Sequence, residues 1–260
     1  MVESPPIIRI DHLSKRFGSL VVLDDVSFDI PTGRTTVLLG PSGTGKSVLL
    51  KNIVGLIQPD AGHIWVDGVD ITTASERKKA ELRKLFGMLF QDGALFDNLT
   101  AGENVAFPLK FHTRLGERER RQKALEALAM VELPDVFDRP TSALSGGQRK
   151  RVGLARAIVL EPKVVLFDEP NSGLDPITSD TIDELIVHMK AKLGITFLVI
   201  THDIVQALHI ADQIGMLYKG RLVEYGTTEA FLRTRQQIVR DFMQRNATLP
   251  PPDGPLIPIP

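Results

Sequence analysis

Apolar and polar residues alternate along residues 7–30, on both sides of the turn-forming segment Phe17-Gly18-Ser19. A two-residue period around a glycine turn predicts a β-hairpin or meander. A short apolar run at residues 36–39 then meets a glycine-rich segment, and a helical pattern follows as far as Val54. We therefore expect a strand, a loop and a helix, in that order, over residues 36–54.

Residues 100–160 form a different kind of region, because few strand-forming residues occur there. Leu125, Leu128 and Val131 follow the spacing of an amphipathic helix. The pattern predicts a helical insert. The dense charges at 117–121 are typical of the solvent-facing side of such a helix.

Two short apolar runs, 164–167 and 196–200, flank an amphipathic helix that carries Ile182, Leu185 and Ile186. Short runs that are apolar at nearly every position are typical of strands buried on both faces of a parallel sheet. Strands that alternate with helices favour an α/β architecture.

The end of the chain predicts one more helix and then a tail. The helix is expected over about residues 228–245, with a shared apolar face made of Phe231, Leu232, Ile238, Val239 and Phe242. From Pro250 onward, six of the final eleven residues are proline. Because proline supplies no backbone N–H, neither a helix nor a strand ladder can continue there. The tail is expected either to be disordered or to lie extended along a partner.

Composition narrows the functional classes. The chain has 260 residues, which predicts one or two domains, and its 31 Lys+Arg against 32 Asp+Glu leave a net charge of −1. Nucleic-acid partners are disfavoured because their binders usually carry a basic excess. The absence of cysteine excludes disulfides, thiol catalysis and thiolate metal sites. No apolar run is long enough to cross a bilayer, and the first ten residues lack the layout of a signal peptide.

The glycine-rich segment after the strand at 36–39 matches the phosphate-binding pattern G-x-x-x-x-G-K-[ST]. Its glycines allow backbone N–H groups to surround phosphate oxygens at the positive end of the following helix. Lys46 is expected to reach the β- and γ-phosphates, and Ser47 to supply a hydroxyl to Mg²⁺. The expected nucleotide-binding residues here are Gly40, Pro41, Ser42, Gly43, Thr44, Gly45, Lys46, Ser47 and Val48.

Two carboxylates end the apolar run at 164–167. Asp168 is placed to hold Mg²⁺ through water, and Glu169 to orient or deprotonate the attacking water. Carboxylates at strand ends are common, so this assignment depends on its coupling to the phosphate-binding loop.

Leu144-Ser145-Gly146-Gly147-Gln148 precedes a helix expected over 149–158. Ser145 can cap that helix, while two glycines expose N–H groups at its positive end. This segment is a second candidate phosphate-binding surface. Two such surfaces on one chain suggest a head-to-tail dimer.

The order of these motifs resembles the nucleotide-binding subunits of ATP-binding-cassette (ABC) transporters. In chain order they are Gly40 to Ser47, Gln91, Leu144 to Gln148, Asp168-Glu169, Ser172 to Asp175, and His202. The resemblance spans residues 7 to about 245. It implies an α/β fold of the ABC-type P-loop NTPases, with a RecA-like core, an antiparallel β subdomain and an α-helical subdomain. It also implies that ATP with Mg²⁺ is bound and that ATP is hydrolysed to drive transport.

The resemblance divides the chain as follows. One ATPase domain is expected over 7–245, with its core in about 7–90 and 161–245. The helical subdomain is expected over about 92–160, and the proline-rich tail over 246–260.

Individual roles follow from the matching positions. Phe17 matches the aromatic residue that stacks on adenine, although the alternative of an edge-strand core residue stays open. Gln91 matches the residue that senses Mg²⁺ and water and links the site to the membrane subunit. Ser145 and Gly147, within the binding segment Ser145, Gly146, Gly147 and Gln148, match residues that contact the γ-phosphate of ATP bound mainly by the other copy.

The remaining roles complete the site implied by the resemblance. Asp175 matches the loop that communicates between the two sites, and His202 matches the histidine that contacts the γ-phosphate. The expected catalytic residues are thus Glu169, His202 and Gln91, and the expected Mg²⁺ residues are Ser47, Gln91 and Asp168. No catalytic position is degenerate, so both composite sites of a homodimer are expected to hydrolyse ATP.

The segment around Gln91 indicates a subgroup. Residues 86–97, with Gly93-Ala94-Leu95-Phe96, and Asn104 to Leu109 are similar to the Mla-type ATPases that serve MCE-protein lipid transporters. The chain departs from some members at Asn171-Ser172. This similarity implies phospholipid trafficking, an integral-membrane permease, an MCE-domain protein and a small STAS-domain subunit as partners. It also implies a peripheral location on the cytoplasmic face of the bacterial inner membrane.

Three alternatives stay open. A small importer of amino acids or metals has the same motifs. A soluble ABC ATPase that acts on DNA or ribosomes needs a long coiled-coil insert or two cassettes in one chain, and neither is present. A GTPase or small-molecule kinase shares only the first motif and leaves residues 144–148 and His202 without a role.

Overall fold

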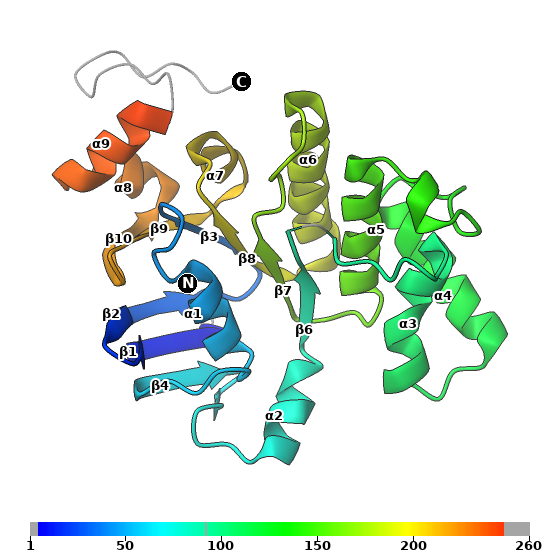
Figure 1. The fold of residues 1–260 in the computed structure, drawn as a ribbon, viewed down its shortest axis with the longest axis horizontal. Helices are drawn as coiled ribbons and strands as arrows, with labels where there is room; N and C mark the ends of the chain where they lie inside the picture. Colours follow the sequence, from blue (N-terminus) through cyan, green and yellow to red (C-terminus); the bar gives the residue numbers. More distant parts are fainter. Residues whose placement is uncertain (1–4, 92, 247–260) are drawn as a thin grey trace.

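The computed structural model describes residues 5–91 and 93–246, which fold around two β-sheets (Figure 1). The antiparallel sheet has the order β2 (Leu20–Ile30), β1 (Ile8–Phe17), β4 (Ala61–Val66) and β5 (Val69–Asp70). The larger sheet has the order β10 (Arg221–Thr227), β9 (Gln213–Tyr218), β3 (Thr35–Leu39), β8 (Thr196–Thr201), β7 (Val164–Asp168) and β6 (Phe86–Leu89). The predicted hairpin around residues 17–19 is confirmed by β1 and β2.

The larger sheet is parallel except at one edge. Strand β3 pairs in parallel with β8 and β9, and β7 pairs in parallel with β8 and β6. Only β10 runs antiparallel, against β9. The predicted α/β architecture is confirmed, and the carboxyl ends of the five parallel strands lie along one edge, where α/β proteins bind ligands.

Helices cover the molecule on both sides of the larger sheet. Figure 1 shows α3, α4 and α5 gathered on the side away from the antiparallel sheet, which confirms the predicted helices of residues 100–160. The helices are α1 (Lys46–Ile53), α2 (Glu76–Arg83), α3 (Ala101–His112), α4 (Glu117–Met130), α5 (Gly146–Ile158), α6 (Pro176–Leu193), α7 (Ile204–Ile210), α8 (Thr228–Leu232) and α9 (Gln237–Asn246).

The two faces of the larger sheet belong to different hydrophobic cores. On β8, Phe197 and Val199 pack with the helices α5 and α6, whereas Leu198 and Ile200 pack with the antiparallel sheet and α1. Successive residues of β8 belong to different cores because side chains along a strand point alternately to its two faces. Both faces are apolar, which explains the continuous apolar runs in the sequence.

Glycine allows α5 to lie very close to the strand and loop that carry Gln91. A Cβ on Gly87 would lie 2.1 Å from the carbonyl oxygen of Ala157, and a Cβ on Gly153 would lie 3.1 Å from that of Gly93. Arg156 fastens the same contact by donating to the carbonyl oxygen of Gly93 at 2.6 Å. Helix α5, which begins within residues 144–148, is thus in direct contact with the loop that follows Gln91.

The prediction of a single helix over about residues 228–245 is wrong. The chain forms α8 and α9 instead, separated by residues 233–236. The Thr234 hydroxyl accepts a hydrogen bond from the N–H of Gln236 at 3.1 Å and donates to Glu224. A hydroxyl that binds a nearby backbone N–H competes with the helical hydrogen bond and ends the helix. The proline-rich tail lies outside the described residues.

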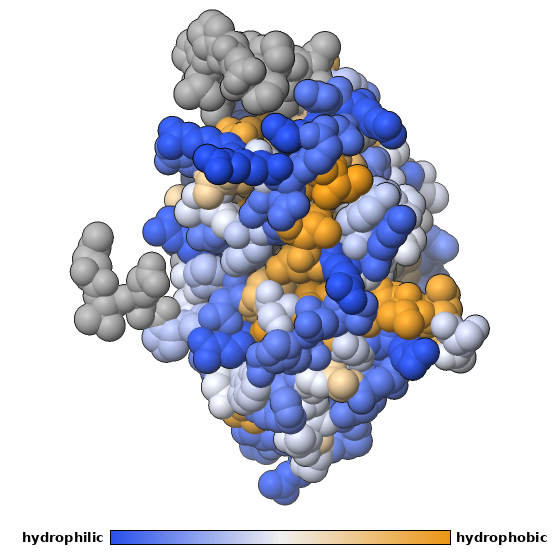
Figure 2. All heavy atoms as spheres, turned by 90° about the vertical axis from the view of Figure 1, so that its left-hand side faces the viewer, coloured by the Kyte–Doolittle hydropathy of each residue, from blue (hydrophilic) through white to orange (hydrophobic). Residues whose placement is uncertain are grey.

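Figure 2 shows the face that carries β1, β2, β10 and α9 in Figure 1. Hydrophilic residues dominate it, and apolar residues gather in a band through its middle. At the β1–β2 turn, the exposed apolar side chains are those of Phe17, Leu20 and Val21. Within residues 5–91 and 93–246, none of the helices has the length and hydropathy needed to span a bilayer.

Candidate functional site

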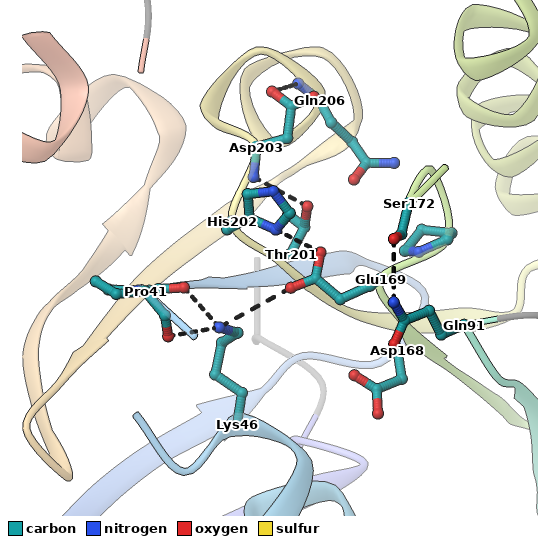
Figure 3. A network of polar contacts seen from close by, with 12 residues as sticks. Pro41, Lys46, Gln91, Asp168, Glu169, Ser172, Thr201, His202, Asp203 and Gln206 are labelled. Carbon is teal, nitrogen blue, oxygen red and sulfur yellow. Dashed lines mark hydrogen bonds and ion pairs between the residues drawn. The ribbon is translucent and has the colours of Figure 1, made fainter. Parts of the chain in front are cut away.

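Most of the expected site residues line one pocket at the carboxyl edge of the parallel strands. Its volume is about 350 Å³. The loops after β3, β6, β7 and β8 all reach it, as Figure 3 shows from close by. The lining residues are Val22, Ser42, Gly43, Gly45, Lys46, Ser47, Val48, Gln91, Asp168, Glu169, Ser172 and His202.

The loop after β3 has a backbone that only glycine fits at two positions. Gly40 has φ +155° and a Cβ there would lie 2.3 Å from the carbonyl oxygen of Leu217. Gly45 has φ +100° and a Cβ there would lie 2.7 Å from the carbonyl oxygen of Val22. Because Gly45 directly precedes α1, the loop aims backbone N–H groups and the positive helix end at the pocket, which favours an anion.

Lys46 carries the positive charge of the pocket. Its side chain is 6% exposed, and Nζ donates hydrogen bonds to the carbonyl oxygens of Gly40 at 2.5 Å and Pro41 at 3.0 Å. Glu169 Oε1 lies 4.0 Å away (Figure 3). Burial lowers the pKa of Lys46, although the charges of Glu169 and Asp168 act in the opposite direction. A buried ammonium held by neutral carbonyl groups is a strong attractor for phosphate.

Ser47, Asp168 and Gln91 place oxygen donors along one wall. Ser47 Oγ donates to Asp168 Oδ1 at 3.3 Å, and Gln91 Nε2 donates to Ser172 Oγ at 3.1 Å. Hydroxyl, carboxylate and amide oxygens suit Mg²⁺, which binds few protein ligands and keeps several waters. The described residues include no cluster of three or more His, Cys, Asp or Glu able to hold a metal. The hydroxyl of Ser47 and the carboxylate of Asp168 fit an Mg²⁺ that is also held by phosphate and water.

Glu169 and His202 are in direct contact in the lining of the pocket. His202 Nδ1 lies 2.8 Å from Glu169 Oε2. The backbone N–H of Glu169 donates to the carbonyl oxygen of Ile200 at 2.9 Å. Glu169 itself has φ +53°, an unusual conformation for a residue other than glycine. That turn directs the carboxylate back over the ends of β7 and β8 and toward Lys46.

The segment 144–148 lies on a separate surface. Ser145 Oγ accepts from the N–H of Gln148 at 3.2 Å, and Gln148 Oε1 accepts from the N–H of Ser145 at 3.0 Å. This capping box confirms that Ser145 caps a helix, but it starts α5 at Gly146, three residues earlier than predicted. The prediction missed these three residues because it read the two glycines as part of a loop.

Asp175 lies beside that surface and outside the pocket lining. It caps α6, where its Oδ1 accepts from the N–H of Thr178 at 3.0 Å and its Oδ2 accepts from the hydroxyl at 2.6 Å. A Cβ on Gly147 would lie 2.4 Å from Thr178 Cγ2. The structure thus brings Gly147 and Asp175 together through Thr178.

Phe17 lies at the end of β1 and does not line the pocket. Its ring is 48% exposed, so the alternative of a core residue is wrong. Lys15 Nζ lies 5.4 Å from the ring centroid. Thr44 turns inward, and its hydroxyl donates to the carbonyl oxygen of Pro41 at 2.9 Å, which stabilises the loop itself.

Several residues in or connected to the pocket lining had no role predicted from the sequence. Val22 and Ser172 belong to its lining. Asp183, on α6, accepts hydrogen bonds from Asn171 and Gln206. Nothing in the helical pattern of α6 distinguishes Asp183 from the other carboxylates of this helix, such as Glu184.

Asp183 leads to a prediction about stability. Burial raises its pKa from an ordinary 3.8 to about 6, although hydrogen bonds from Gln206 and Asn171 oppose the shift. The folded protein therefore binds this proton more tightly than the unfolded chain, and the charged form costs stability above pH 6. We expect Asp183→Asn to raise the free energy of unfolding, and the gain to grow by about 1 kcal/mol between pH 5 and pH 8.

Urea unfolding at both pH values would measure the gain. Asp180→Asn, which alters an exposed carboxylate on the same helix, is the control and should give the same difference at both pH values. An equal effect of Asp183→Asn at pH 5 and pH 8 would contradict the expectation.

A larger groove of about 560 Å³ lies between α4, α6 and α7. It includes Met130, Leu185, His188 and His209, and none of the expected nucleotide residues. Size alone therefore does not identify the site, whereas the convergence of a buried lysine, two carboxylates and a histidine does.

Comparison with known proteins gives relatives over most of the chain. A family model described as "ABC transporter" matches residues 23–172. The probable ribonucleotide transport ATP-binding protein mkl of Mycobacterium leprae is 45% identical over 236 residues, which cover 91% of this chain and 68% of that protein. The chain thus spans about two thirds of the length of that relative.

Two further matches extend over nearly all of the other protein. The intermembrane phospholipid transport system ATP-binding protein MlaF of Haemophilus influenzae is 38% identical over 250 residues, or 96% of this chain and 93% of that protein. The dimeric structure of the ATP-binding cassette MJ0796 bound to ADP and Pi superposes with a TM-score of 0.78 at 32% identity. That match covers 85% of this chain and 98% of the other.

Proposed function

The chain belongs to the ABC transporter family as an ATP-binding, ATP-hydrolysing subunit, and from this premise we propose that it powers phospholipid trafficking between bacterial membranes through an Mla/MCE-type permease. The single observation that carries the proposal is the match to MlaF, which extends over 93% of that protein. The resemblance of the segment around Gln91 to the Mla-type ATPases supports the same assignment.

The geometry of the pocket supports a specific division of labour in ATP hydrolysis. Glu169 orients the attacking water and accepts its proton, while His202 contacts the γ-phosphate. The water attacks phosphorus in line, the bond to the bridging oxygen of ADP breaks, and phosphate leaves. Lys46 and the N–H groups of the loop neutralise the developing charge.

Mg²⁺ fits the wall formed by Ser47, Gln91 and Asp168. When bound there with ATP, it would offset the charge of the β- and γ-phosphates. Ser47 would bind it directly, and Asp168, which already accepts the Ser47 hydroxyl, would hold it through water. Phe17, exposed at the β1–β2 turn, is assigned to stack on adenine.

A second copy of the chain completes the site in this proposal. Ser145 and Gly147 lie on a surface apart from the pocket, so they are available to the ATP held by Gly40 to Ser47 of another copy. Asp175, joined to Gly147 through Thr178, would pass information between the two sites. The dimeric form of the MJ0796 structure supports this arrangement.

Three aromatic side chains form an exposed surface beside the loop that follows Gln91, and we assign it to the permease. The Phe107 ring packs against those of Phe96 and Phe111 in tilted contacts, with ring centroids 4.5 Å and 4.8 Å apart. Phe96 is 42% and Phe111 64% exposed. Buried Asn104 fixes the loop to α3, because its amide both accepts from and donates to the backbone of Phe96.

Phe111→Ser tests that surface. We expect it to weaken the complex with the permease about tenfold or more, as the loss of an aromatic anchor does, while the basal ATPase rate stays unchanged. Co-purification from membranes and permease-stimulated ATPase activity would measure the effect. Leu56→Ser removes an equally exposed apolar side chain elsewhere and is the control. Equal complex yields for Phe111→Ser and wild type would contradict this placement.

We also propose that the ATPase domain consists of a core of about 7–90 and 161–245 and a helical subdomain of about 92–160. In this proposal the chain lies at the cytoplasmic face of the inner membrane, and its partners include an MCE-domain protein and a small STAS-domain subunit. The alternative, a small-solute importer, is favoured by the name of the mkl relative, which refers to ribonucleotide transport.

Reconstitution distinguishes these cargoes. The membrane complex isolated with the tagged chain is placed in vesicles with fluorescent phospholipid, and transfer to acceptor vesicles is measured with and without ATP. ATP-dependent transfer that is lost in the Glu169→Gln complex would support lipid cargo. A complex that instead contains a solute-binding protein, and moves no lipid, would support the importer.

A further inference from the structure

The segment that follows Glu169 is held from several sides. Lys150, on α5, donates from Nζ to the carbonyl oxygens of Pro170 and Ser172, both at 2.5 Å. Gln91 donates to the Ser172 hydroxyl. These contacts tie the segment to the helix of residues 146–158 and to the loop after β6.

Asn171, in the middle of that segment, makes a different kind of contact. Its Nδ2 donates to Asp183 Oδ1 at 3.0 Å, and Gln206 Nε2 donates to the same oxygen at 2.7 Å. Asp183 is 4% and Gln206 2% exposed. Asn171 lies two residues after Glu169, and Gln206 lies four residues after His202. One buried carboxylate oxygen therefore joins the two segments that carry Glu169 and His202, whose side chains are in contact in the pocket.

The two amide groups depend on Asp183 for this contact. Asn171 Oδ1 and Gln206 Oε1 are buried without a hydrogen-bond partner in the described structure. Neither amide is fixed from its oxygen side, so the carboxylate sets their orientation. Hydrogen bonds to an ionised acceptor are roughly twice as strong as those between neutral groups.

We propose that Asp183 is a positioning residue for ATP hydrolysis, which holds Glu169 and His202 in register by joining Asn171 to Gln206. The inference rests on the proposed roles of Glu169 and His202. The strand contact between Glu169 and Ile200 fixes the start of both segments. Asp183 supplies a second point of attachment beyond the strand ends, where Glu169 has already left the extended conformation.

The charged groups around Asp183 come from the elements packed against it. His209 on α7 and Asp203 at the N-cap of this helix act on the pKa of Asp183 in opposite directions, and burial raises it. The charged carboxylate therefore strengthens the two hydrogen bonds while it lowers stability. Rate and stability are expected to change in opposite directions when the charge is removed, which a merely structural role would not produce.

The test compares Asp183→Leu and Asp183→Asn in the full chain with Mg²⁺ and ATP at pH 8. Asp183→Leu removes both hydrogen bonds and is expected to lower kcat at least tenfold, with ATP affinity within twofold of wild type. Asp183→Asn keeps an acceptor oxygen but removes the charge, so it is expected to raise the unfolding midpoint while it lowers kcat by up to about threefold. Gln206→Met, which removes one donor at similar volume, is expected to lower kcat threefold or more and serves if Asp183→Leu does not fold.

Ile186→Ala is the matched control, because Ile186 is fully buried on the same helix and belongs to the apolar core. It is expected to lower the unfolding midpoint and leave kcat within twofold. The proposal is overturned if Asp183→Leu, or Gln206→Met in its place, keeps kcat within twofold, or if Ile186→Ala lowers kcat as much. Glu169→Gln, measured in parallel, separates the two questions, since its full activity would remove the catalytic role itself.

Discussion

Glu169→Gln is expected to reduce ATP turnover by about a hundredfold to ten-thousandfold, the range over which a general base contributes, and to leave ATP binding intact. Glutamine matches the size of glutamate, so it should keep the φ of +53° at this position. The amide cannot take a proton from water. It also removes a negative charge that repels the γ-phosphate while every phosphate donor remains.

The same variant should therefore accumulate as a closed dimer in ATP. Size-exclusion chromatography with and without ATP would show the dimer, and phosphate release would give the rate. Glu161→Gln, at an exposed position that pairs with Lys123 before β7, should behave as wild type. Hydrolysis by Glu169→Gln at the wild-type rate would show that another group activates the water.

Lys46→Ala is expected to weaken ATP binding about a hundredfold or more. Each hydrogen bond from a charged donor contributes about 1.5–3 kcal/mol, and tenfold in affinity corresponds to about 1.4 kcal/mol. The lysine is buried between the loop carbonyls and Glu169, and the described residues that line the pocket include no other lysine or arginine. Its loss leaves two carboxylates facing the phosphates.

Titration with a fluorescent ATP analogue would measure the affinity. Lys51→Ala removes an exposed lysine from the same helix and should bind ATP normally. Unchanged affinity in Lys46→Ala would refute the assignment of residues 40–47 as the phosphate-binding loop.

Features encoded by neighbouring residues could be predicted from the sequence. The strand, loop and helix around Lys46 were foreseen because glycine spacing and periodicity act over a few residues. The Ser145 cap was foreseen for the same reason. Asp168 and Glu169 were placed near Lys46 because they end an apolar run, whereas His202 was assigned to the site only by the resemblance to ABC subunits.

Features that depend on distant contacts could not be predicted. The break between α8 and α9 comes at Thr234, whose hydroxyl binds the N–H of Gln236 and also donates to Glu224 on β10, a contact that the pattern of residues 228–245 does not reveal. The contact of Asp183 with Asn171 and Gln206 joins three elements, and α6 shows no sign of it in its own pattern. The exposure of Phe17 likewise became evident only from the packed structure.

Because glycines bring α5 into close contact with the loop after Gln91, a movement of this loop would tilt the helix. At Gly153 the helix approaches the loop with no side chain between them, and Arg156 donates a hydrogen bond to Gly93. Because the contact is this tight, a displacement of the loop would also displace the helix. From Arg156 to Ser145 the helix is about 16 Å long, at about 1.5 Å rise per residue. A tilt of about five degrees at the Gly93 end thus moves the Ser145 end by about 1.4 Å, enough to make or break a hydrogen bond with a phosphate oxygen.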